Sequence, residues 1–392
     1  MKGYLNEIID RKGTNSMKWD KAFLKKQFGR GDLLPLWVAD MDFKCPQSVI
    51  HAIIKRAEHG IFGYSFRDDS YDEAVVSWNK KRHNWEIHKD WIVFTPGVVP
   101  ALNYLIQAFC LPGDKVIIQD PVYYPFRKAI IDNGCQVVYN SLKMENGYYR
   151  MDFDDLEEKV KDSSVKFLIL CSPHNPVGRV WEKEELVRLG KICIKNNVMI
   201  VADEIHSDLI LKGHKHIPFA SISEEFAQNS IICTAPSKTF NLAGLQMSNI
   251  IIANEKLRTC FKKVLTRNHV ELSNTFGIVA LTAAYKEGEE WLEDVLDYLG
   301  SNVDFIEQFV KEKMPQVKFI RPQGTYLGWL DFRDMTKNKK ELEDIFINKA
   351  KVALDAGYWF GKDGEGFARI NFACPQKTLE EALNRIERAI YE

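Results

Sequence analysis

The sequence predicts an α/β fold, with a mostly parallel sheet sandwiched by helices as the large domain and a smaller α+β domain beside it. Short β-branched runs alternate with longer amphipathic stretches from about residue 90 to 290, and the alternation stops after that. A repeated order of strand, helix and strand favours parallel strands covered on both faces. With 392 residues, 45% of them hydrophobic, the chain is long enough for two domains. We expect a large domain over residues 46–289 and a small domain made of 1–45 and 290–392.

Six short apolar runs are the expected strands of the large sheet. Between them, apolar residues at helical spacing predict helices over 99–110 and 183–196. The strands are expected at 91–94, 116–119, 165–170, 198–202, 231–234 and 249–253.

The carboxyl-terminal part of the chain has a different pattern. A long charged helix is expected over 290–313 and a closing helix over 379–391. Strand-like runs lie at 317–320, 326–332 and 368–372. Because these strands are grouped and do not alternate with helices, this part is expected to form the smaller α+β domain.

The composition favours a small-molecule partner. Lys and Arg number 53 against 54 Asp and Glu, so the net charge of −1 gives no electrostatic reason to expect binding to nucleic acid or an acidic membrane. The eight cysteines include no Cys-x-x-Cys pair, which favours a reduced, cytoplasmic setting over a disulfide framework. The amino terminus lacks the apolar core of a signal peptide, and no run approaches the ~20 apolar residues of a membrane span. The nine histidines form no ligand-spaced pair with cysteine or acid, so no metal is expected.

Polar side chains follow four of the expected strands, at the point where each strand ends. In chain order they are Tyr123 with Tyr124, Asn175, Asp203 with His206, and Lys238. In open parallel α/β sheets, ligands bind outside the carboxyl ends of the strands. The four groups together therefore predict a ligand site at this edge of the sheet.

These side chains suit one ligand, pyridoxal phosphate. Lys238 is a lone amine among small and hydroxyl residues, placed to form a Schiff base with an aldehyde. Asp203 would keep a pyridine nitrogen protonated, Asn175 can donate to the ring hydroxyl, and Tyr123 can stack on the ring. The segment 95–102 puts a glycine turn at the start of an apolar helix, where free backbone N–H groups can bind phosphate.

Arg369 is a charged residue within an otherwise apolar expected strand. A guanidinium in such a place needs a fixed anionic partner. A substrate carboxylate fits its bidentate fork, and an internal Asp or Glu would serve as well. The sequence leaves both alternatives open.

Longer motifs resemble those of a known enzyme family. They are Lys18-Trp19-Asp20, Trp-Val-Ala-Asp-Met-Asp-Phe at 37–43, Phe62-Gly63-Tyr64, Pro-Val-Tyr-Tyr-Pro-Phe at 121–126, Cys-Ser-Pro-His-Asn-Pro-Val-Gly-Arg-Val-Trp at 171–181, Asp-Glu-Ile-His-Ser-Asp at 203–208 and Ala-Pro-Ser-Lys-Thr-Phe-Asn at 235–241. With them the chain resembles, nearly from end to end, the fold-type I pyridoxal-phosphate enzymes of the class I and II aminotransferase family. It is most similar to the β-C-S lyase branch, which contains cystathionine β-lyases and cystalysin-like cysteine desulfhydrases.

The resemblance implies a role for each matching residue around the cofactor. Lys238 would form the Schiff base and then remove the substrate α proton. Tyr64 would reach across a subunit interface to the neighbouring phosphate, so the active unit would be a homodimer. The other implied cofactor-binding residues are Asp203, Asn175, Tyr123, His206, Val98, Val99 and Ser237.

The resemblance also implies the substrate contacts. Arg369 would bind the substrate α-carboxylate, and Tyr124 would line the pocket near the leaving group. Tyr64 and Ala39 would also contact the substrate, and Tyr123 and Tyr124 would join Lys238 as catalytic residues.

Two residues depart from the broader aminotransferase pattern. His206 stands where most relatives carry a tyrosine that contacts the ring hydroxyl, and Gln246 stands where many carry a phosphate-binding arginine. Both changes fit the lyase branch. They leave the backbone near Val98 and Val99, together with Ser237, to bind more of the phosphate.

The leading functional hypothesis is β-elimination from L-cystathionine, L-cysteine or related S-substituted cysteines, giving pyruvate, ammonia and a thiol or sulfide. A thiol with a pKa near ~8.5 leaves far more readily than an alkyl group, so loss of sulfur can precede reprotonation of the cofactor. The sequence does not rank cystathionine against cysteine.

Three other functions compete with β-elimination. The main alternative is an aminotransferase for aromatic or neutral amino acids, because Tyr64, Tyr123, Tyr124 and Trp359 could form an apolar pocket. A non-catalytic cofactor-binding protein would not require Lys238, Asp203 and Arg369 together. A nicotinamide dehydrogenase is disfavoured, because no Gly-x-Gly-x-x-Gly follows any expected strand.

Overall fold

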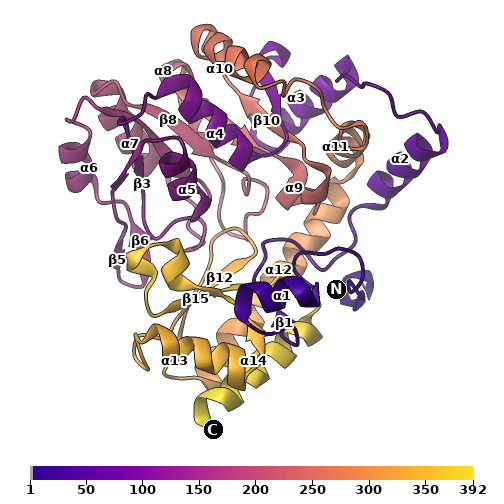
Figure 1. Cartoon of the computed structure of the whole chain (residues 1–392), viewed down its shortest axis with the longest axis vertical. Coiled ribbons are helices and arrows are strands. Elements are labelled where there is room, and N and C mark those ends of the chain that lie inside the picture. Colours follow the sequence, from indigo (N-terminus) through magenta and orange to yellow (C-terminus); the bar gives the residue numbers. More distant parts are fainter. Residues whose placement is uncertain (1–2) are drawn as a thin grey trace.

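The computed structural model describes residues 3–392 and contains a large mixed sheet and a smaller antiparallel one (Figure 1). The large sheet has seven strands in the order β2-β10-β9-β8-β7-β3-β4. These strands are β2 (Ile92–Thr95), β3 (Lys115–Ile118), β4 (Gln136–Tyr139), β7 (Val165–Cys171), β8 (Met199–Asp203), β9 (Ser230–Thr234) and β10 (Ser248–Ile251). The five strands from β9 to β4 are parallel, whereas β10 runs antiparallel to both β9 and β2. The expected mostly parallel sheet is therefore confirmed.

Helices cover both faces of the large sheet. Successive residues of a strand point to opposite faces, so the strands contribute side chains to two separate cores. One core contains Val93 and Ile118 and packs against α4 (Val98–Phe109), α5 (Pro125–Asp132) and α10 (Glu255–Arg267). The other core contains Phe94 and Ile117, with side chains from α3 (Asp69–His83), α7 (Lys183–Lys195) and α11 (Thr275–Glu287). The arrangement leaves the ends of the strands uncovered by these helices.

The smaller sheet lies below the large one in Figure 1 and has the order β11-β12-β15-β14. Its strands are β11 (Lys318–Ile320), β12 (Leu327–Asp331), β14 (Asp355–Ala356) and β15 (Phe367–Asn371), all antiparallel to their neighbours. The long helix α12 (Glu289–Lys313) precedes it, and α14 (Gln376–Tyr391) follows it. In addition, β1 (Leu34–Pro35) pairs in parallel with β13 (Val352–Ala353), which ties the amino-terminal segment to this part. The domain boundaries at 45/46 and 289/290 stay a prediction.

The remaining α-helices and strands are short, apart from α2. They are α1 (Lys21–Phe28), α2 (Gln47–Glu58), α6 (Phe153–Lys159), α8 (Glu224–Gln228), α9 (Pro236–Thr239), α13 (Lys339–Glu343), and the hairpin of β5 (Lys143–Glu145) with β6 (Tyr148–Arg150). The sequence did not predict β4, because this strand lies at the sheet edge, where half of its residues are exposed and the apolar pattern is weak. Within residues 3–392, no helix combines the length and the apolar character that crossing a membrane requires.

Candidate active site

Lys238 lies on the short helix α9, which begins with Pro236 directly after the buried strand β9. Its amine donates a hydrogen bond to the backbone carbonyl of Ala39 at 2.8 Å. Burial, with a smaller effect from Arg369, lowers the pKa of Lys238 from 10.5 to about 8, although Asp40 and Asp203 act in the opposite direction. About a tenth of the amine is therefore neutral at pH 7, far more than for an ordinary lysine, and the neutral amine is the form that attacks an aldehyde or accepts a proton.

Asp203 is the last residue of β8, and its side chain is only 5% exposed. The carboxylate accepts a hydrogen bond from the backbone N–H of Ile205 at 3.1 Å. Burial raises the pKa of Asp203 from 3.8 to about 7, against the weaker effects of this hydrogen bond and of Lys238. A buried carboxylate with so high a pKa gains most from a ligand that brings a positive charge or an N–H group.

His206 and Asn175 come from the loops that follow β8 and β7. His206 is buried, its ring meets Tyr326 edge-on, and its Nδ1 has no hydrogen-bond partner among residues 3–392. Burial, followed by the charges of Lys238 and Arg369, holds the pKa of His206 well below its usual value. The side chain is therefore a neutral imidazole with a free ring nitrogen. Asn175 is also buried, and its Oδ1 accepts a hydrogen bond from Arg369 at 3.0 Å.

These side chains line one cavity of ≈ 200 Å³. The structure brings most of the predicted cofactor-binding residues together there: Val98, Val99, Tyr123, Asn175, Asp203, His206, Ser237 and Lys238. Val98 and Val99 form the first turn of α4, where backbone N–H groups have no helical acceptor. Gln246, the residue that replaces the phosphate-binding arginine of many relatives, also lines the cavity.

A second cavity, of ≈ 600 Å³, adjoins the first and shares Ala39, Tyr123 and Lys238 with it. Arg369 and Tyr124 line this second cavity, as predicted for substrate-binding residues. Trp359 lines it too, with its ring centroid 6.4 Å from that of Tyr124. The Lys238 amine therefore lies between a space suited to a cofactor and a larger space suited to a substrate.

Arg369 has an internal acid as a partner, which resolves one alternative left by the sequence. Its Nη2 donates to the Asp355 carboxylate and to the carbonyl of Trp37, the latter at 2.8 Å. Asp355 lies opposite Arg369 in the pairing of β14 with β15. The Nε of Arg369 is buried without a hydrogen-bond partner among residues 3–392, so the guanidinium keeps a donor for a ligand.

Tyr64 is not part of either cavity. It lies in the segment between α2 and α3, and its side chain is 96% exposed. Its predicted contact with a phosphate and a substrate would therefore have to be made in another subunit.

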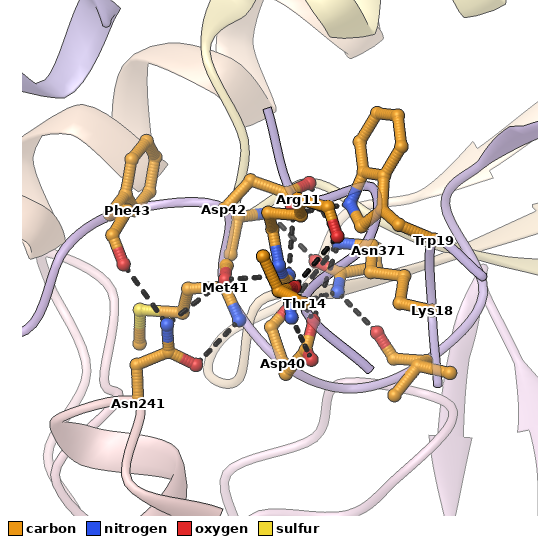
Figure 2. A network of polar contacts seen from close by, with 12 residues as sticks. Arg11, Thr14, Lys18, Trp19, Asp40, Met41, Asp42, Phe43, Asn241 and Asn371 are labelled. Carbon is orange, nitrogen blue, oxygen red and sulfur yellow. Dashed lines mark hydrogen bonds and ion pairs between the residues drawn. The ribbon is translucent and has the colours of Figure 1, made fainter. Parts of the chain in front are cut away.

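A group of buried and half-buried charges, which we call the charge cluster, lies beside the backbone of residues 38–43 (Figure 2). Arg11 pairs with Asp40 and Asp42 at 2.7 Å each, and Lys18 pairs with Asp42 at 2.8 Å. Trp19 adds a hydrogen bond to Asp42 at 2.8 Å. These contacts join the motif at 18–20 to the motif at 37–43. They fix the backbone that carries the Ala39 carbonyl.

Sequence reasoning missed several residues around the site. Tyr326 donates to the same Ala39 carbonyl as Lys238, at 2.8 Å, and no motif pointed to it. Asp355 could not be found because its contact depends on the register of two short strands. Asn371 was detectable, because it follows Arg369 by two residues on a strand and so shares its face.

The sequence of this chain matches a known protein family and curated relatives over most of its length. The model of the family "Aminotransferase class I and II" matches residues 31–386. A curated relative, cystathionine beta-lyase PatB of Bacillus subtilis, is 46% identical over 381 residues, covering 97% of this chain and 98% of the relative. Protein MalY of Escherichia coli is 32% identical over 387 residues, with 98% of each chain covered.

Solved structures agree with this comparison. Cystalysin from Treponema denticola, which contains a pyridoxal 5'-phosphate cofactor, has a TM-score of 0.95 and 41% identity, covering 99% of this chain and 98% of that one. The PLP-bound C-S lyase from Staphylococcus hominis has a TM-score of 0.92 and 38% identity, with the same coverage.

Proposed function

The chain belongs to the class I and II aminotransferase family, and from this premise we propose that it is a pyridoxal-phosphate-dependent carbon–sulfur lyase. Its substrates would be L-cystathionine, L-cysteine or related S-substituted cysteines, which it would convert with water into pyruvate, ammonia and a thiol or sulfide. The observation that carries the proposal is the 46% identity to a cystathionine β-lyase over nearly the whole of both chains. The geometry alone fits an aminotransferase equally well, because both reactions begin with loss of the α proton.

The residues of the smaller cavity fit pyridoxal phosphate. Asp203, with its raised pKa, would gain a protonated pyridine nitrogen as its partner. The unpartnered Nδ1 of His206 and the amide of Asn175 are polar groups that a ring hydroxyl can satisfy. The first turn of α4 and Ser237 would bind the phosphate, and Tyr123 would lie against the ring.

When bound, the cofactor supplies an electron-withdrawing ring that stabilises negative charge at the substrate α-carbon. Lys238 holds the cofactor in the resting protein, and its amine then takes the α proton at Nζ. The lowered pKa of Lys238, about 8, suits this role because the amine must be neutral to accept a proton.

The larger cavity would hold the substrate. The free Nε edge of Arg369 would bind the α-carboxylate while Asp355 and Trp37 keep the guanidinium in place. Tyr124 would contact the sulfur side of the substrate, opposite the carboxylate. Both tyrosines at 123 and 124 are neutral at physiological pH, because burial raises the pKa of each above its usual value.

The aminotransferase hypothesis keeps one supporting observation. Tyr123, Tyr124 and Trp359 line the substrate cavity, and an aromatic wall suits aromatic or neutral amino acids. The two reactions differ in their products, so an experiment separates them directly.

The test is to follow the visible absorption of the purified protein with bound cofactor while L-cystathionine or L-cysteine is added and pyruvate is assayed. Pyruvate that accumulates while the absorption band persists supports the lyase. Conversion of the cofactor into its amine form, with little pyruvate and a keto acid needed to restore the band, would support the aminotransferase. No pyruvate from any sulfur-bearing substrate would contradict the lyase proposal.

We also propose that the enzyme is a homodimer with its active sites at the interface. The segment between α2 and α3 exposes Ile61, Phe62, Tyr64 and Phe66, with exposed fractions from 56% to 96%. Phe62 packs against Phe276 of α11, and the nearby Leu272 is 59% exposed. Exposed apolar side chains grouped in this way are typical of an interaction surface.

Subunit complementation tests the dimer. Tyr64→Ala and Lys238→Ala proteins should each lose activity, whereas mixed dimers of the two contain one intact site. Unfolding and refolding the two together should restore about a quarter of the parent activity, the share expected for random pairing of subunits. No recovery in proteins that refold as dimers would show that Tyr64 does not act across the interface.

A cytoplasmic location is proposed on the state of the cysteines. All eight are free thiols, and Cys260 is exposed. Free thiols persist where the surroundings are reducing.

A further inference from the structure

Three residues of the 37–43 motif form a tight turn beside the catalytic amine. The backbone N–H of Asp40 donates to the carbonyl of Val38 at 2.9 Å, which closes a γ-turn with Ala39 at its apex. We call residues 37–40 the spacer segment. It contacts β15 through Asn371 and helix α9 through Lys238.

The spacer segment contacts both reactive groups through its backbone. The carbonyl of Trp37 accepts from Nη2 of Arg369 at 2.8 Å, and the carbonyl of Ala39 accepts from Nζ of Lys238 at 2.8 Å. The carboxylate-binding group and the base are thus attached to carbonyls two residues apart on one short segment. The distance between them follows from the conformation of that segment.

Asn371 fixes this conformation from the side. Its Nδ2 donates to the carbonyls of Val38 and Asp40, at 2.6 Å each, and its Oδ1 accepts from the backbone N–H of Ala373 at 2.8 Å. The two carbonyls that it binds flank Ala39. Asn371 is fully buried and lines neither cavity, so its side chain is not placed to touch a cofactor or substrate.

Two further sets of contacts fix the end of the segment. Asn241, which lies three residues after Lys238, bonds the backbone of Met41 with both its oxygen and its nitrogen, at 3.0 Å each. The charge cluster binds the side chains of Asp40 and Asp42. Figure 2 shows Asn241 reaching this backbone from one side of the charged residues. The position of Ala39 is therefore determined from several directions: Tyr326 binds its carbonyl, and Asn371 binds the carbonyls of both flanking residues.

We propose that Asn371 is a positioning residue, which holds the spacer segment so that the Trp37 and Ala39 carbonyls set the Arg369 guanidinium and the Lys238 amine at the spacing that the reaction needs. The inference rests on the proposed function for the roles of these two groups. It assigns a task to a residue that touches neither cofactor nor substrate. A displacement of the amine by about 1 Å would be enough to slow proton transfer by about 10²-fold.

The chain offers a matched control in Asn302 on α12. Asn302 is also buried, and its Nδ2 donates to two carbonyls two residues apart, Phe372 at 2.8 Å and Cys374 at 3.0 Å. The changes Asn371→Ala and Asn302→Ala each remove two such bonds. A purely structural role predicts that both variants lose stability, Asn371→Ala somewhat more because its bond with Ala373 is also lost, and that the two do not differ in catalysis.

The experiment compares the two variants in cofactor loading, catalysis and stability. Loading of pyridoxal phosphate onto the cofactor-free protein is followed by absorption as a function of pH, which reports the Lys238 amine without any turnover. Asn371→Ala should move the pH midpoint of the loading rate below the parent value, because the Ala39 carbonyl that favours the charged amine is displaced. It should also lower kcat by about 10²-fold. Asn302→Ala should keep the parent midpoint and kcat while losing a similar amount of thermal stability.

Equal behaviour of the two asparagine variants in midpoint and kcat would overturn the proposal. If Asn371→Ala does not fold, Tyr326→Phe tests the same carbonyl with a nearly isosteric change. The Tyr326 hydroxyl shares the Ala39 oxygen with Lys238, so its removal should strengthen the remaining bond and move the midpoint above the parent value. An unchanged midpoint in Tyr326→Phe would equally contradict the proposal. Because loading is measured without substrate, a failure of the lyase assay would not be mistaken for a failure of this inference.

Discussion

Asp42 in the charge cluster and Asp203 in the cofactor cavity are both 5% exposed, yet their pKa values move in opposite directions. Burial acts to raise both. For Asp42 the charges and hydrogen bonds of Lys18, Trp19 and Arg11 outweigh burial, so its pKa is lowered. Asp203 has only weak compensation, and its pKa rises to about 7.

The two buried lysines repeat this contrast. Lys18 is fully buried and meets the Asp42 carboxylate at 2.8 Å, whereas Lys238 meets a neutral carbonyl at the same distance. Burial alone therefore does not distinguish a scaffold from an active site. Buried charges whose polar atoms are all paired hold the backbone in place, and those that keep an unpaired polar atom, as Arg369 does at Nε beside its ion pair with Asp355, are available for a ligand.

The largest expected effect is on activity in the cofactor cavity. Lys238→Met should reduce pyruvate release from L-cystathionine by at least about 10⁴-fold, because both the attachment of the cofactor and the base are lost. The cofactor-free variant should be no less stable than the parent in urea unfolding, since burial disfavours the charged amine and within residues 3–392 its hydrogen bond goes to a neutral carbonyl. Activity close to that of the parent would contradict the role of Lys238.

The matched change in the charge cluster should act on stability. Within residues 3–392, Lys18→Met leaves Asp42 and Asp40 with Arg11 as their one cationic partner, so the free energy of unfolding should fall by about 3–5 kcal/mol. Urea unfolding of the two Lys→Met variants side by side measures the difference. If both variants were equally stable, the distinction between the two regions would be wrong.

Asp203→Asn should lower the activity of the enzyme but raise the stability of the cofactor-free protein. Turnover should fall by about 10²-fold, because the amide cannot hold a proton on the pyridine nitrogen. The cofactor-free protein should gain about 1–3 kcal/mol above pH 7, since it no longer buries a negative charge. The sign follows from the raised pKa: the parent loses stability as the pH rises from about 3.8 to about 7, and the loss is complete above this range. Stability profiles of the two proteins against pH, measured without cofactor, test this.

The smallest expected effect is the pH dependence of cofactor loading in the parent. The Lys238 amine attacks only when neutral, and its pKa is about 8. The loading rate should therefore level off above pH 8 and fall about tenfold per pH unit well below it. A rate that still rises between pH 9 and 10 would show an amine with the ordinary value near 10.5.

The sequence predicted the parts of the site that follow directly from strand order. Asp203 ends a buried strand, and Lys238 and Asn175 each follow a buried strand of the same sheet, so their meeting at one edge could be expected. The pairing of Arg369 with Asp355 could not, because it depends on the register of two short strands.

The charge cluster shows another limit of sequence reasoning. Its residues belong to motifs that were recognised, but their contacts join loops near residues 11–18 and 40–42 whose path no periodic pattern encodes. Asn371 could have been predicted to lie on the same face of its strand as Arg369, since alternate residues of a strand share a face. What could not be foreseen was that its amide would bind the backbone of a distant loop.

The γ-turn at residues 38–40 has a consequence for how this enzyme can be altered. Its contacts with Arg369 and Lys238 come from main-chain oxygens, which every amino acid supplies. The spacing of the two carbonyls therefore depends on the number of peptide units between Trp37 and Asp40. It depends little on the side chain of Ala39 at the apex of the turn. Natural and engineered variants of this enzyme should therefore tolerate substitution of Ala39 by another small residue far more readily than the insertion or deletion of one residue in the turn.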